Sequence, residues 1–208
     1  MWETVKSQAS QGAYSMPHKP LLIIVNGLPG AGKTTLARQM ANDLGIPIVS
    51  RDGIYETLYD ALDCVADEAA SLLGAASFAL LYEVAGAVLA AGQPIIIEGF
   101  FGRPGMRRNE LLMLQQRHDF EPLEILCVAD GTVLKERLLA RVASSERHKS
   151  HQDTQWLEHN GARLLQGQLT PLALGGPIIE INTTTAEGFE YVDLLRRVRE
   201  NLQDTGAP

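Results

Sequence analysis

The sequence has little cysteine and no surplus of basic residues, and both shortages exclude classes of protein. Its two cysteines, Cys64 and Cys127, lie far apart in apolar surroundings and form no Cys-x-x-Cys pair, so neither a zinc site nor a redox motif is supported. Isolated cysteines of this kind are typical of buried thiols in a reducing compartment. The formal net charge is −7, whereas a nucleic-acid binder usually carries a basic stripe. A long nucleic acid is therefore an unexpected partner.

Long hydrophobic runs are missing as well. Residues 1–20 are polar and lack the apolar centre of a signal peptide, and the apolar stretches fall short of the ~20 residues that a membrane span requires. With 208 residues, of which 45% are hydrophobic, the chain is long enough to build one core. We expect a cytoplasmic protein without membrane contact, with a flexible arm at residues 1–19 and a single domain at 20–208.

Apolar runs alternate with helical patterns along this domain. The runs predict strands at 21–25, 46–50, 94–98, 123–128 and 177–181. Helices are predicted at 34–41, 52–59, 67–91, 106–117, 132–142 and 187–202, with 67–91 forming one helix or two because Gly74 and Gly86 interrupt it. Strands that alternate with helices predict a parallel sheet covered on both faces, and such sheets bind ligands at the carboxyl ends of their strands.

A glycine-rich segment follows the first predicted strand and matches G-x-x-x-x-G-K-[ST] in full. Its glycines allow successive backbone N–H groups to face one anion, and the next helix adds its positive dipole end. This pattern predicts a nucleotide phosphate site, with Lys33 on the β- and γ-phosphates and the Thr34 hydroxyl on Mg²⁺. The chain has no Asn-Lys-x-Asp sequence, which GTP-specific proteins usually need, so ATP is the expected nucleotide. The phosphate-binding residues are Gly27, Leu28, Pro29, Gly30, Ala31, Gly32, Lys33, Thr34 and Thr35.

Three further segments make the chain similar to a known family. They are Ser50-Arg51-Asp52 after the second strand, the arginines Arg137, Arg141 and Arg147 with His148, and the segment 178–184. With the phosphate loop, they resemble small P-loop kinases of the nucleoside-monophosphate-kinase type. Within these, the chain is similar to the group with polynucleotide kinase, zeta-toxin-like and chloramphenicol-phosphotransferase-like domains. The resemblance covers residues 20–200.

This resemblance implies a fold, an activity and a set of catalytic residues. The fold is the three-layer α/β/α P-loop NTPase fold, with a five-stranded parallel sheet in the order 2-3-1-4-5 and a small lid at about 141–155. The activity is phosphoryl transfer from ATP, with Mg²⁺, to an acceptor hydroxyl that faces Asp52. Lid arginines, above all Arg141 and Arg147, would act with Lys33 on the charge that develops during transfer.

The acidic candidates each have an alternative role. Asp52 either orients the acceptor and takes its proton, or caps the helix that begins near Gly53. Glu98 ends the apolar strand 95–97 at the rim of the sheet. It serves the metal directly or through water, contacts the substrate, acts as the base, or pairs with a rim cation. Asp130 is predicted to cap the helix that follows it.

Basic and aromatic residues supply the candidates for the acceptor side. Arg51 holds a phosphate or the acceptor, or is solvated. Arg103, Arg107 and Arg108 form a local basic patch that suits an anionic acceptor, or they belong to a solvated helix start. The alternative for the lid arginines is a charged helix face. Phe100 and Phe101 line an acceptor pocket or pack in the core, and His148, His151 and His159 are expected on the surface or the lid rather than on a metal.

These residues leave three functions open. The first is a kinase for a small-molecule acceptor. The second is a polynucleotide or nucleoside kinase with the same chemistry, which the basic patch favours and the net charge opposes. The third is a nucleotide-dependent ATPase switch, which needs loops that sense the γ-phosphate and a surface for a partner. Protein partners cannot be inferred from the sequence.

Overall fold

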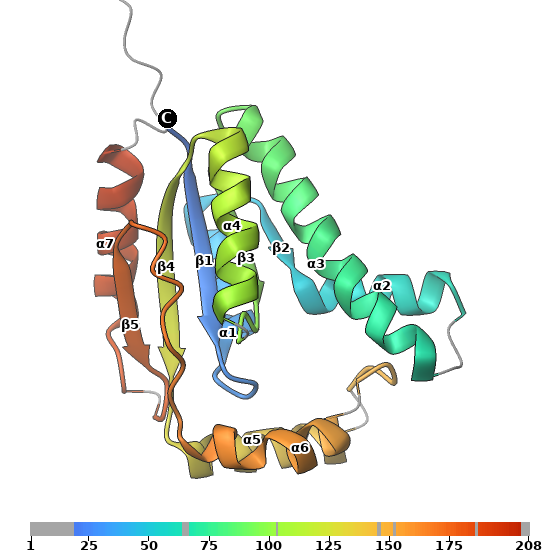
Figure 1. Cartoon of the computed structure of the whole chain (residues 1–208). Coiled ribbons are helices and arrows are strands. Elements are labelled where there is room, and N and C mark those ends of the chain that lie inside the picture. Colours follow the sequence, from blue (N-terminus) through green and yellow to red (C-terminus); the bar gives the residue numbers. More distant parts are fainter. Residues whose placement is uncertain are drawn as a thin grey trace, which may run out of the picture.

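The computed structural model describes residues 19–63, 67–102, 104–144, 147–151, 153–185 and 187–204. A five-stranded sheet lies in its centre, in the order β2-β3-β1-β4-β5, and every neighbouring pair of strands is parallel (Figure 1). The predicted order is thereby confirmed. The strands are β1 Leu21–Gly27, β2 Ile48–Ser50, β3 Ile95–Gly99, β4 Glu121–Val128 and β5 Ile178–Asn182.

All predicted helices are present, and the structure contains one further helix. The segment after residue 66 forms one continuous helix, α3, and the extra helix is α6, which the sequence reading did not predict. The residues predicted to form the arm lie outside the described part of the chain, apart from Lys19. The helices are α1 Lys33–Leu44, α2 Arg51–Ala61, α3 Asp67–Ala90, α4 Pro104–His118, α5 Gly131–Ala143, α6 Asp153–Leu165 and α7 Tyr191–Asp204.

The core consists of two apolar layers, one on each face of the sheet. In β1, Leu21 and Ile23 point to one face and Leu22 and Ile24 to the other, and all four are buried. Helices α1 and α7 cover the first face, whereas α3 and α4 cover the second. Because β1 is buried on both faces, its unbroken apolar run is what a central parallel strand requires. Cys127 lies in the first layer, and burial raises the pKa of its thiol to about 12; Cys64 lies outside the described residues.

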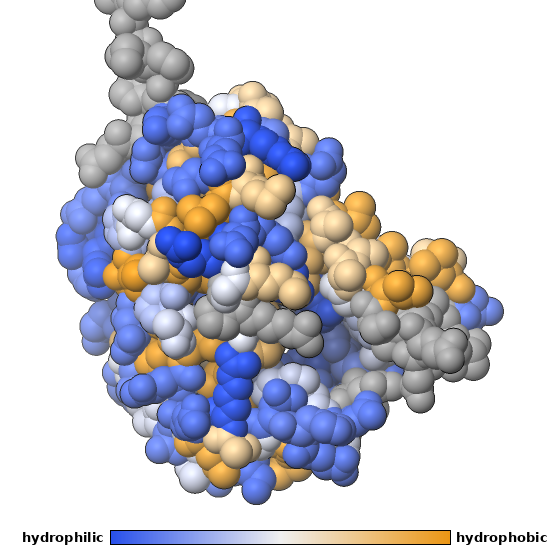
Figure 2. Space-filling view, viewed as in Figure 1, coloured by the Kyte–Doolittle hydropathy of each residue, from blue (hydrophilic) through white to orange (hydrophobic). Residues whose placement is uncertain are grey.

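Helix α3 is more apolar than the sequence reading allowed. Its segment Leu72–Ala90 is long and apolar enough to cross a membrane by length and composition, but 39% of it is buried inside the protein. Phe78, Leu81, Ala85 and Leu89 contribute to the second core layer. Its outer side exposes the apolar residues Leu72, Leu80 and Val84. Figure 2 shows hydrophobic surface on the right of the molecule, where α3 runs in Figure 1.

Helices α5 and α6 lie side by side across the carboxyl ends of the strands, at the bottom of Figure 1. Helix α6 begins at Asp153 and packs through Trp156, Leu157 and Leu164 against the first core layer. This pair of helices therefore closes the end of the sheet at which parallel α/β folds bind ligands.

Candidate functional site: a phosphate loop and two adjoining cavities

The phosphate loop joins β1 to α1 with a tight backbone path. Gly30 and Gly32 have φ values of 85° and 73°, a region that side chains with a Cβ rarely adopt. The Ala31 N–H donates to the Leu28 carbonyl at 3.1 Å, and Lys33 Nζ donates to the same carbonyl at 3.0 Å. The lysine side chain is thus held over the loop and is mostly buried. The loop has the curved backbone that the sequence pattern predicted.

A cleft of about 600 Å³ opens beside this loop. It brings together residues from the phosphate loop, the start of α2, the end of β3, the lid and α6. Of the predicted site residues, Thr35 is exposed on α1 and is not part of the lining. Arg103 lies outside the described residues. The other predicted residues that do not line this cleft are Gly27, Leu28, Gly30, Ala31, Gly32 and Arg107. The charged and polar residues that line the cleft include Lys33, Thr34, Arg51, Asp52, Glu98, Arg141, Arg147, Asp153, His151, His159 and Asn160.

Ser50, rather than Asp52, caps helix α2. The Ser50 hydroxyl accepts from the Gly53 N–H at 3.4 Å and donates to Glu98 Oε2 at 2.8 Å. The capping role considered for Asp52 is therefore wrong, and its carboxylate is left for the cleft. Glu98 was expected at an open rim, but its side chain is almost fully buried, with 2% of the residue exposed. Glu98 nevertheless lines the cleft, next to Ser50.

Asp52 lies among positive charges at the start of α2. Arg51 Nη1 donates to its Oδ1 at 3.1 Å. Burial raises the pKa of Asp52, but the charges of His151, Arg51 and Lys33 outweigh burial and hold that pKa below its ordinary value. The Asp52 carboxylate is therefore ionised at neutral pH. A carboxylate in this state can accept a hydrogen bond from a hydroxyl group.

The three arginines on and after α5 have different surroundings. Arg137 donates to the carbonyls of Gly30, Thr183 and Thr184, at 3.4, 2.7 and 3.2 Å. It therefore joins the phosphate loop to the segment after β5. Arg141 is exposed and lines the cleft. Arg147 also lines the cleft, where it forms a two-pronged pair with Asp153 at 2.6 and 2.8 Å.

The predicted lid rests on α2. His148 Nε2 lies 3.0 Å from Asp60 Oδ2, and His151 Nε2 lies 2.7 Å from Glu56 Oε1. The His148 hydrogen bond lowers the pKa of Asp60, although burial opposes it. The lid role considered for these histidines agrees with this placement, but a surface position does not hold for His151, whose side chain is only 8% exposed. Within the described residues, no group of three His, Cys, Asp or Glu side chains is placed to hold a metal ion.

A second cavity, of about 530 Å³, adjoins the first. Arg51, Asp52, Phe100 and Trp156 line both. Phe100 therefore has the pocket role, whereas Phe101 is buried in the second core layer. The remaining residues that line the second cavity are Gly74, Ala75, Phe78, Gly102, Met106, Arg107 and Glu110.

Arg107 and Arg108 of the predicted basic patch do not face the same site. Arg107 lines the second cavity but is paired with Glu110 at 2.7 and 3.0 Å and lies 3.5 Å above the Phe78 ring. Arg108, one residue later on the helix, points elsewhere and donates to the Ala173 carbonyl at 3.3 Å. Consecutive residues lie about 100° apart around a helix, so neighbouring arginines do not face one site.

Sequence reasoning missed the residues that α3 and α6 bring to the two cavities. Phe78 comes from the middle of α3, and Trp156, His159 and Asn160 come from α6. A signal for α6 was available, because Trp156, Leu157 and Leu164 have helical spacing and Asp153 stands at the first position. The polar residues before Asp153 concealed it.

Comparisons with known proteins agree with this geometry. A family model described as an AAA domain, AAA_33, matches residues 22–163. The chain belongs to this family. A solved structure of a candidate kinase from Chloroflexus aurantiacus is 33% identical to this AAA domain, covers 90% of this chain and 98% of its own, and has a TM-score of 0.80. The fold of the chain is therefore that of P-loop proteins of the kinase type.

More distant matches show the fold alone. A sugar kinase from Janibacter is 19% identical to this AAA domain, with 89% and 95% of the chains covered and a TM-score of 0.54. Kti12 from Chaetomium thermophilum, solved with ADP-AlF3, is 17% identical, with 87% and 98% covered and a TM-score of 0.60. An uncharacterized protein from Mycobacterium tuberculosis is 28% identical over 131 residues, which are 60% of this chain. The chain spans about a quarter of the length of this relative, 26%.

Proposed function

We propose that this AAA domain is an ATP-dependent phosphotransferase that moves the γ-phosphate of ATP to a hydroxyl group of a small molecule. One observation carries the proposal: an ionised carboxylate, Asp52, shares a cleft with Lys33 and Thr34 of a complete phosphate loop, and a second cavity opens on its other side. Phosphoryl transfer needs little more from a protein than positioning, charge stabilisation and a carboxylate that orients the nucleophile.

The residues of the cleft fit a magnesium ion. Mg²⁺ prefers oxygen ligands and is usually held by one or two carboxylates together with substrate phosphates. The Thr34 hydroxyl and the carboxylates of Asp52 and Glu98 supply such oxygens here. Thr34 would hold the ion, with Asp52 or Glu98 bound to it directly or through water. The bound ion would supply charge neutralisation at the β- and γ-phosphates.

The remaining residues divide the work of the transfer. Lys33 and the backbone N–H groups of the loop would hold the phosphates, and Asp52 would accept the hydrogen bond of the acceptor hydroxyl. The hydroxyl oxygen forms a bond to the γ-phosphorus, the bond from that phosphorus to the bridging oxygen breaks, and ADP leaves. The hydroxyl proton passes to Asp52. Arg141, which reaches the cleft from the lid side, would neutralise the charge on the transferred group. Arg147, whose Nε and Nη2 are paired with Asp153, would add its remaining donors.

The structure lends less support to the alternatives. A polynucleotide kinase drew its support from a basic patch, but Arg107 is neutralised by Glu110 and Arg108 points away from the cavity. An ATPase switch needs no acceptor cavity beside its carboxylate. A cytoplasmic location and the absence of membrane contact remain parts of the proposal.

The test is a screen of hydroxyl compounds with purified protein, Mg²⁺ and ATP labelled in the γ-phosphate. We expect labelled product from wild type and none from Lys33→Ala. Asp52→Asn should still bind ATP but lose orders of magnitude in transfer, because only the acceptor step loses its carboxylate. Glu83→Gln, which neutralises an exposed carboxylate on α3, is the control and should match wild type. Release of free phosphate that no acceptor changes would favour the ATPase instead.

A further inference from the structure

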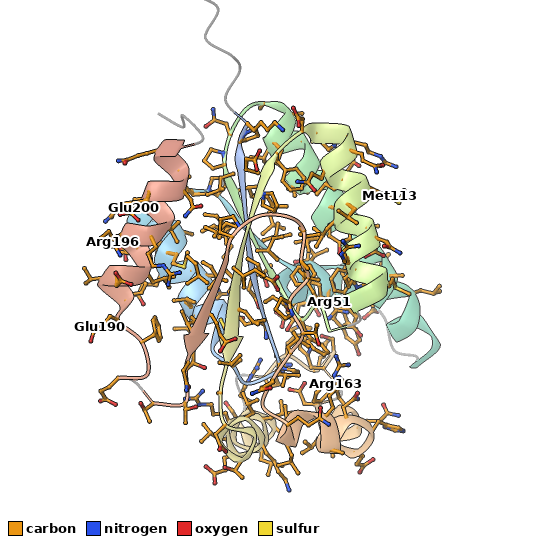
Figure 3. All side chains as sticks on the ribbon, turned by 60° about the vertical axis from the view of Figure 1, so that its left-hand side comes forward. Arg51, Met113, Arg163, Glu190, Arg196 and Glu200 are labelled. Atoms are coloured by element: carbon orange, nitrogen blue, oxygen red, sulfur yellow. The ribbon has the colours of Figure 1, made fainter. Side chains whose placement is uncertain are left out.

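Arg51 stands where the two cavities meet. It lines both of them, and in Figure 3 it lies between α4 and the α5–α6 pair, above Arg163 of α6. Its guanidinium carbon lies 4.6 Å from the centre of the Tyr55 ring and 5.4 Å from that of Phe78. Gly74 of α3 leaves it room, because a Cβ at that position would lie 3.4 Å from Arg51 Nη2. The side chain is therefore packed between aromatic rings, beside the carboxylate of Asp52.

The hydrogen-bonding capacity of Arg51 is largely unused. Its Nη1 donates to Asp52, but its buried Nε has no partner among the described residues. Only 20% of the side chain is exposed. A buried donor without a partner is costly, and a guanidinium offers its N–H groups in a planar fork that fits carboxylate or phosphate oxygens. The unused donors of Arg51 are thus matched to anionic oxygens from a ligand.

The other charges of the second cavity are already paired. Arg107 Nη1 donates to both carboxylate oxygens of Glu110, at 3.0 and 2.7 Å. Asp52 has its own role toward a hydroxyl group. Arg51 and Arg107 are the cations described around this cavity and Asp52 and Glu110 are its anions, so these four charges already sum to zero. An anionic group of a ligand would therefore be held by the N–H groups that Arg51 leaves free, and not by a net positive charge of the cavity.

The remaining walls of the second cavity are mostly apolar side chains. Phe100 and Trp156 meet edge to face, with ring centres 5.9 Å apart, and Phe78 lies on the α3 side. Met106 adds a flexible apolar side chain. A polyol would leave many of its hydroxyl groups without partners against such walls, and unpaired polar groups cost binding. A flat apolar ring would instead bury its faces against these side chains.

We propose that the acceptor is a ring compound with a free hydroxyl group and one anionic group, a carboxylate or a phosphate, and that Arg51 binds the anion. Its ring lies against the Phe100–Trp156 pair and Met106, and its hydroxyl group faces Asp52. The inference rests on the proposed function, since the hydroxyl group is the one that receives the γ-phosphate.

The experiment uses a panel of ring alcohols, each made as a carboxylate, a phosphate ester and a neutral amide. One such set is 4-(hydroxymethyl)benzoate, 4-(hydroxymethyl)phenyl phosphate and 4-(hydroxymethyl)benzamide; glucose and gluconate represent polyols. Binding is measured by calorimetry with Mg²⁺ and a non-hydrolysable ATP analogue, and transfer with labelled ATP. Within the set of compounds that binds best, we expect the carboxylate or the phosphate ester to have an affinity and a kcat/KM at least about tenfold higher than the amide. This is the effect of one well-formed charged hydrogen bond. The carboxylate and phosphate arms show which anion is preferred.

Two arginine variants locate the effect. Arg51→Gln should lower the affinity for the anions to that for the amide while the ATP analogue still binds. Transfer to every compound should change as well, because Arg51 also contacts Asp52, so affinity is the measurement that decides. Arg108→Gln removes an arginine of α4 that points away from the cavity, and it should keep the full preference for anions. The inference is overturned if amides or polyols bind as well as the anions, if Arg51→Gln lowers the affinity for anions and amides equally, or if no anion binds. Anion binding that depends on Arg51 without labelled product from any compound would uphold the anion site and overturn the kinase.

Discussion

Ser50 and Glu98 are register partners at the ends of β2 and β3, and the Ser50 hydroxyl donates to Glu98 Oε2 at 2.8 Å. The same hydroxyl caps α2 by accepting from the Gly53 N–H. One side chain thus fixes the buried carboxylate of β3 and the first turn of the helix that carries Arg51 and Asp52. The position of the proposed acceptor carboxylate depends on this serine.

Ser50→Ala should therefore lower the free energy of unfolding. Loss of a helix cap costs ~1 kcal/mol, and a buried acceptor left without its partner costs ~1–3 kcal/mol, so we expect a loss of about 2–4 kcal/mol in urea unfolding. Thr57→Ala is the control, because its hydroxyl donates to the Gly53 carbonyl on the exposed side of the same helix. It should cost less than ~0.5 kcal/mol. Equal losses in the two variants would contradict the link through Ser50.

The sequence predicted the sheet well because its central strands β1 and β3 contain short apolar runs followed by turn or site residues. The strands around Ile23 and Ile96 are buried on both faces, so no amphipathic period was needed to find them. The strand order, by contrast, came from family resemblance, since composition carries no information on which strands are neighbours. The phosphate loop was predictable because its backbone path demands glycines at fixed positions.

The acceptor side was harder to predict because it depends on contacts between distant segments. Nothing near Arg107 in the sequence shows that Phe78 and Glu110 hold its side chain. The capping role of Ser50 was concealed by Asp52, an equally good capping residue two positions later. The polar segment before Asp153 was predicted as part of a small lid, and no pattern in the sequence indicates that His148 and His151 contact carboxylates of α2.

The pH dependence of transfer should report the charges around Asp52. Burial raises the pKa of Asp52 and the cations His151, Arg51 and Lys33 lower it more, so the folded-state pKa lies below the unfolded value of 3.8. The stability that ionised Asp52 contributes is present above 3.8 and is lost as pH falls through the lower folded pKa. Transfer should therefore keep its Asp52-dependent rate down to pH values below the ordinary range of carboxyl groups.

His151→Gln removes one of these positive charges, since imidazoles are charged at acid pH. The pKa of Asp52 should rise, and the acid limb of the kcat profile should move to higher pH. His159→Gln changes another histidine of the same cleft, whose Nδ1 is bonded to the Gln155 carbonyl of its own helix, and it should leave the limb in place. Circular dichroism at each pH separates titration from unfolding. A limb that does not move in His151→Gln would remove that residue from the electrostatics of Asp52.

The pair between Arg147 and Asp153 should hold the lid segment 147–151 in place. Its two contacts are short and both side chains are mostly buried, at 15% and 13% exposure. A hydrogen bond to a charged group is worth about 1.5–3 kcal/mol, so Asp153→Asn should speed amide hydrogen exchange in this segment by about 10- to 100-fold. Asp193→Asn breaks the exposed pair with Arg196 on α7 and should change exchange little. Unchanged exchange in Asp153→Asn would mean that the histidine contacts alone retain the lid.

Asn26 should be among the least replaceable residues of the sheet. Its Nδ2 donates to Glu124 Oε1 at 2.9 Å, and its Oδ1 accepts from the N–H groups of Gly27 and Phe101 at 2.9 and 3.2 Å. Asn26→Ala leaves a buried carboxylate and two buried N–H groups short of partners, so we expect a loss of ~3–5 kcal/mol in urea unfolding. Asn201→Ala, which removes one bond to the Arg197 carbonyl within α7, should cost less than ~1 kcal/mol.

The loss in Asn26→Ala should also depend on pH in a definite direction. Burial raises the pKa of Glu124, whereas the Asn26 hydrogen bond lowers it by favouring the ionised form. The stabilisation from Asn26 is therefore full where Glu124 is ionised and declines as pH falls through its raised pKa. The difference in unfolding free energy between wild type and Asn26→Ala should narrow as pH is lowered from neutral. If the difference in unfolding free energy does not change with pH, Asn26 stabilises the fold through the Gly27 and Phe101 N–H groups rather than through Glu124.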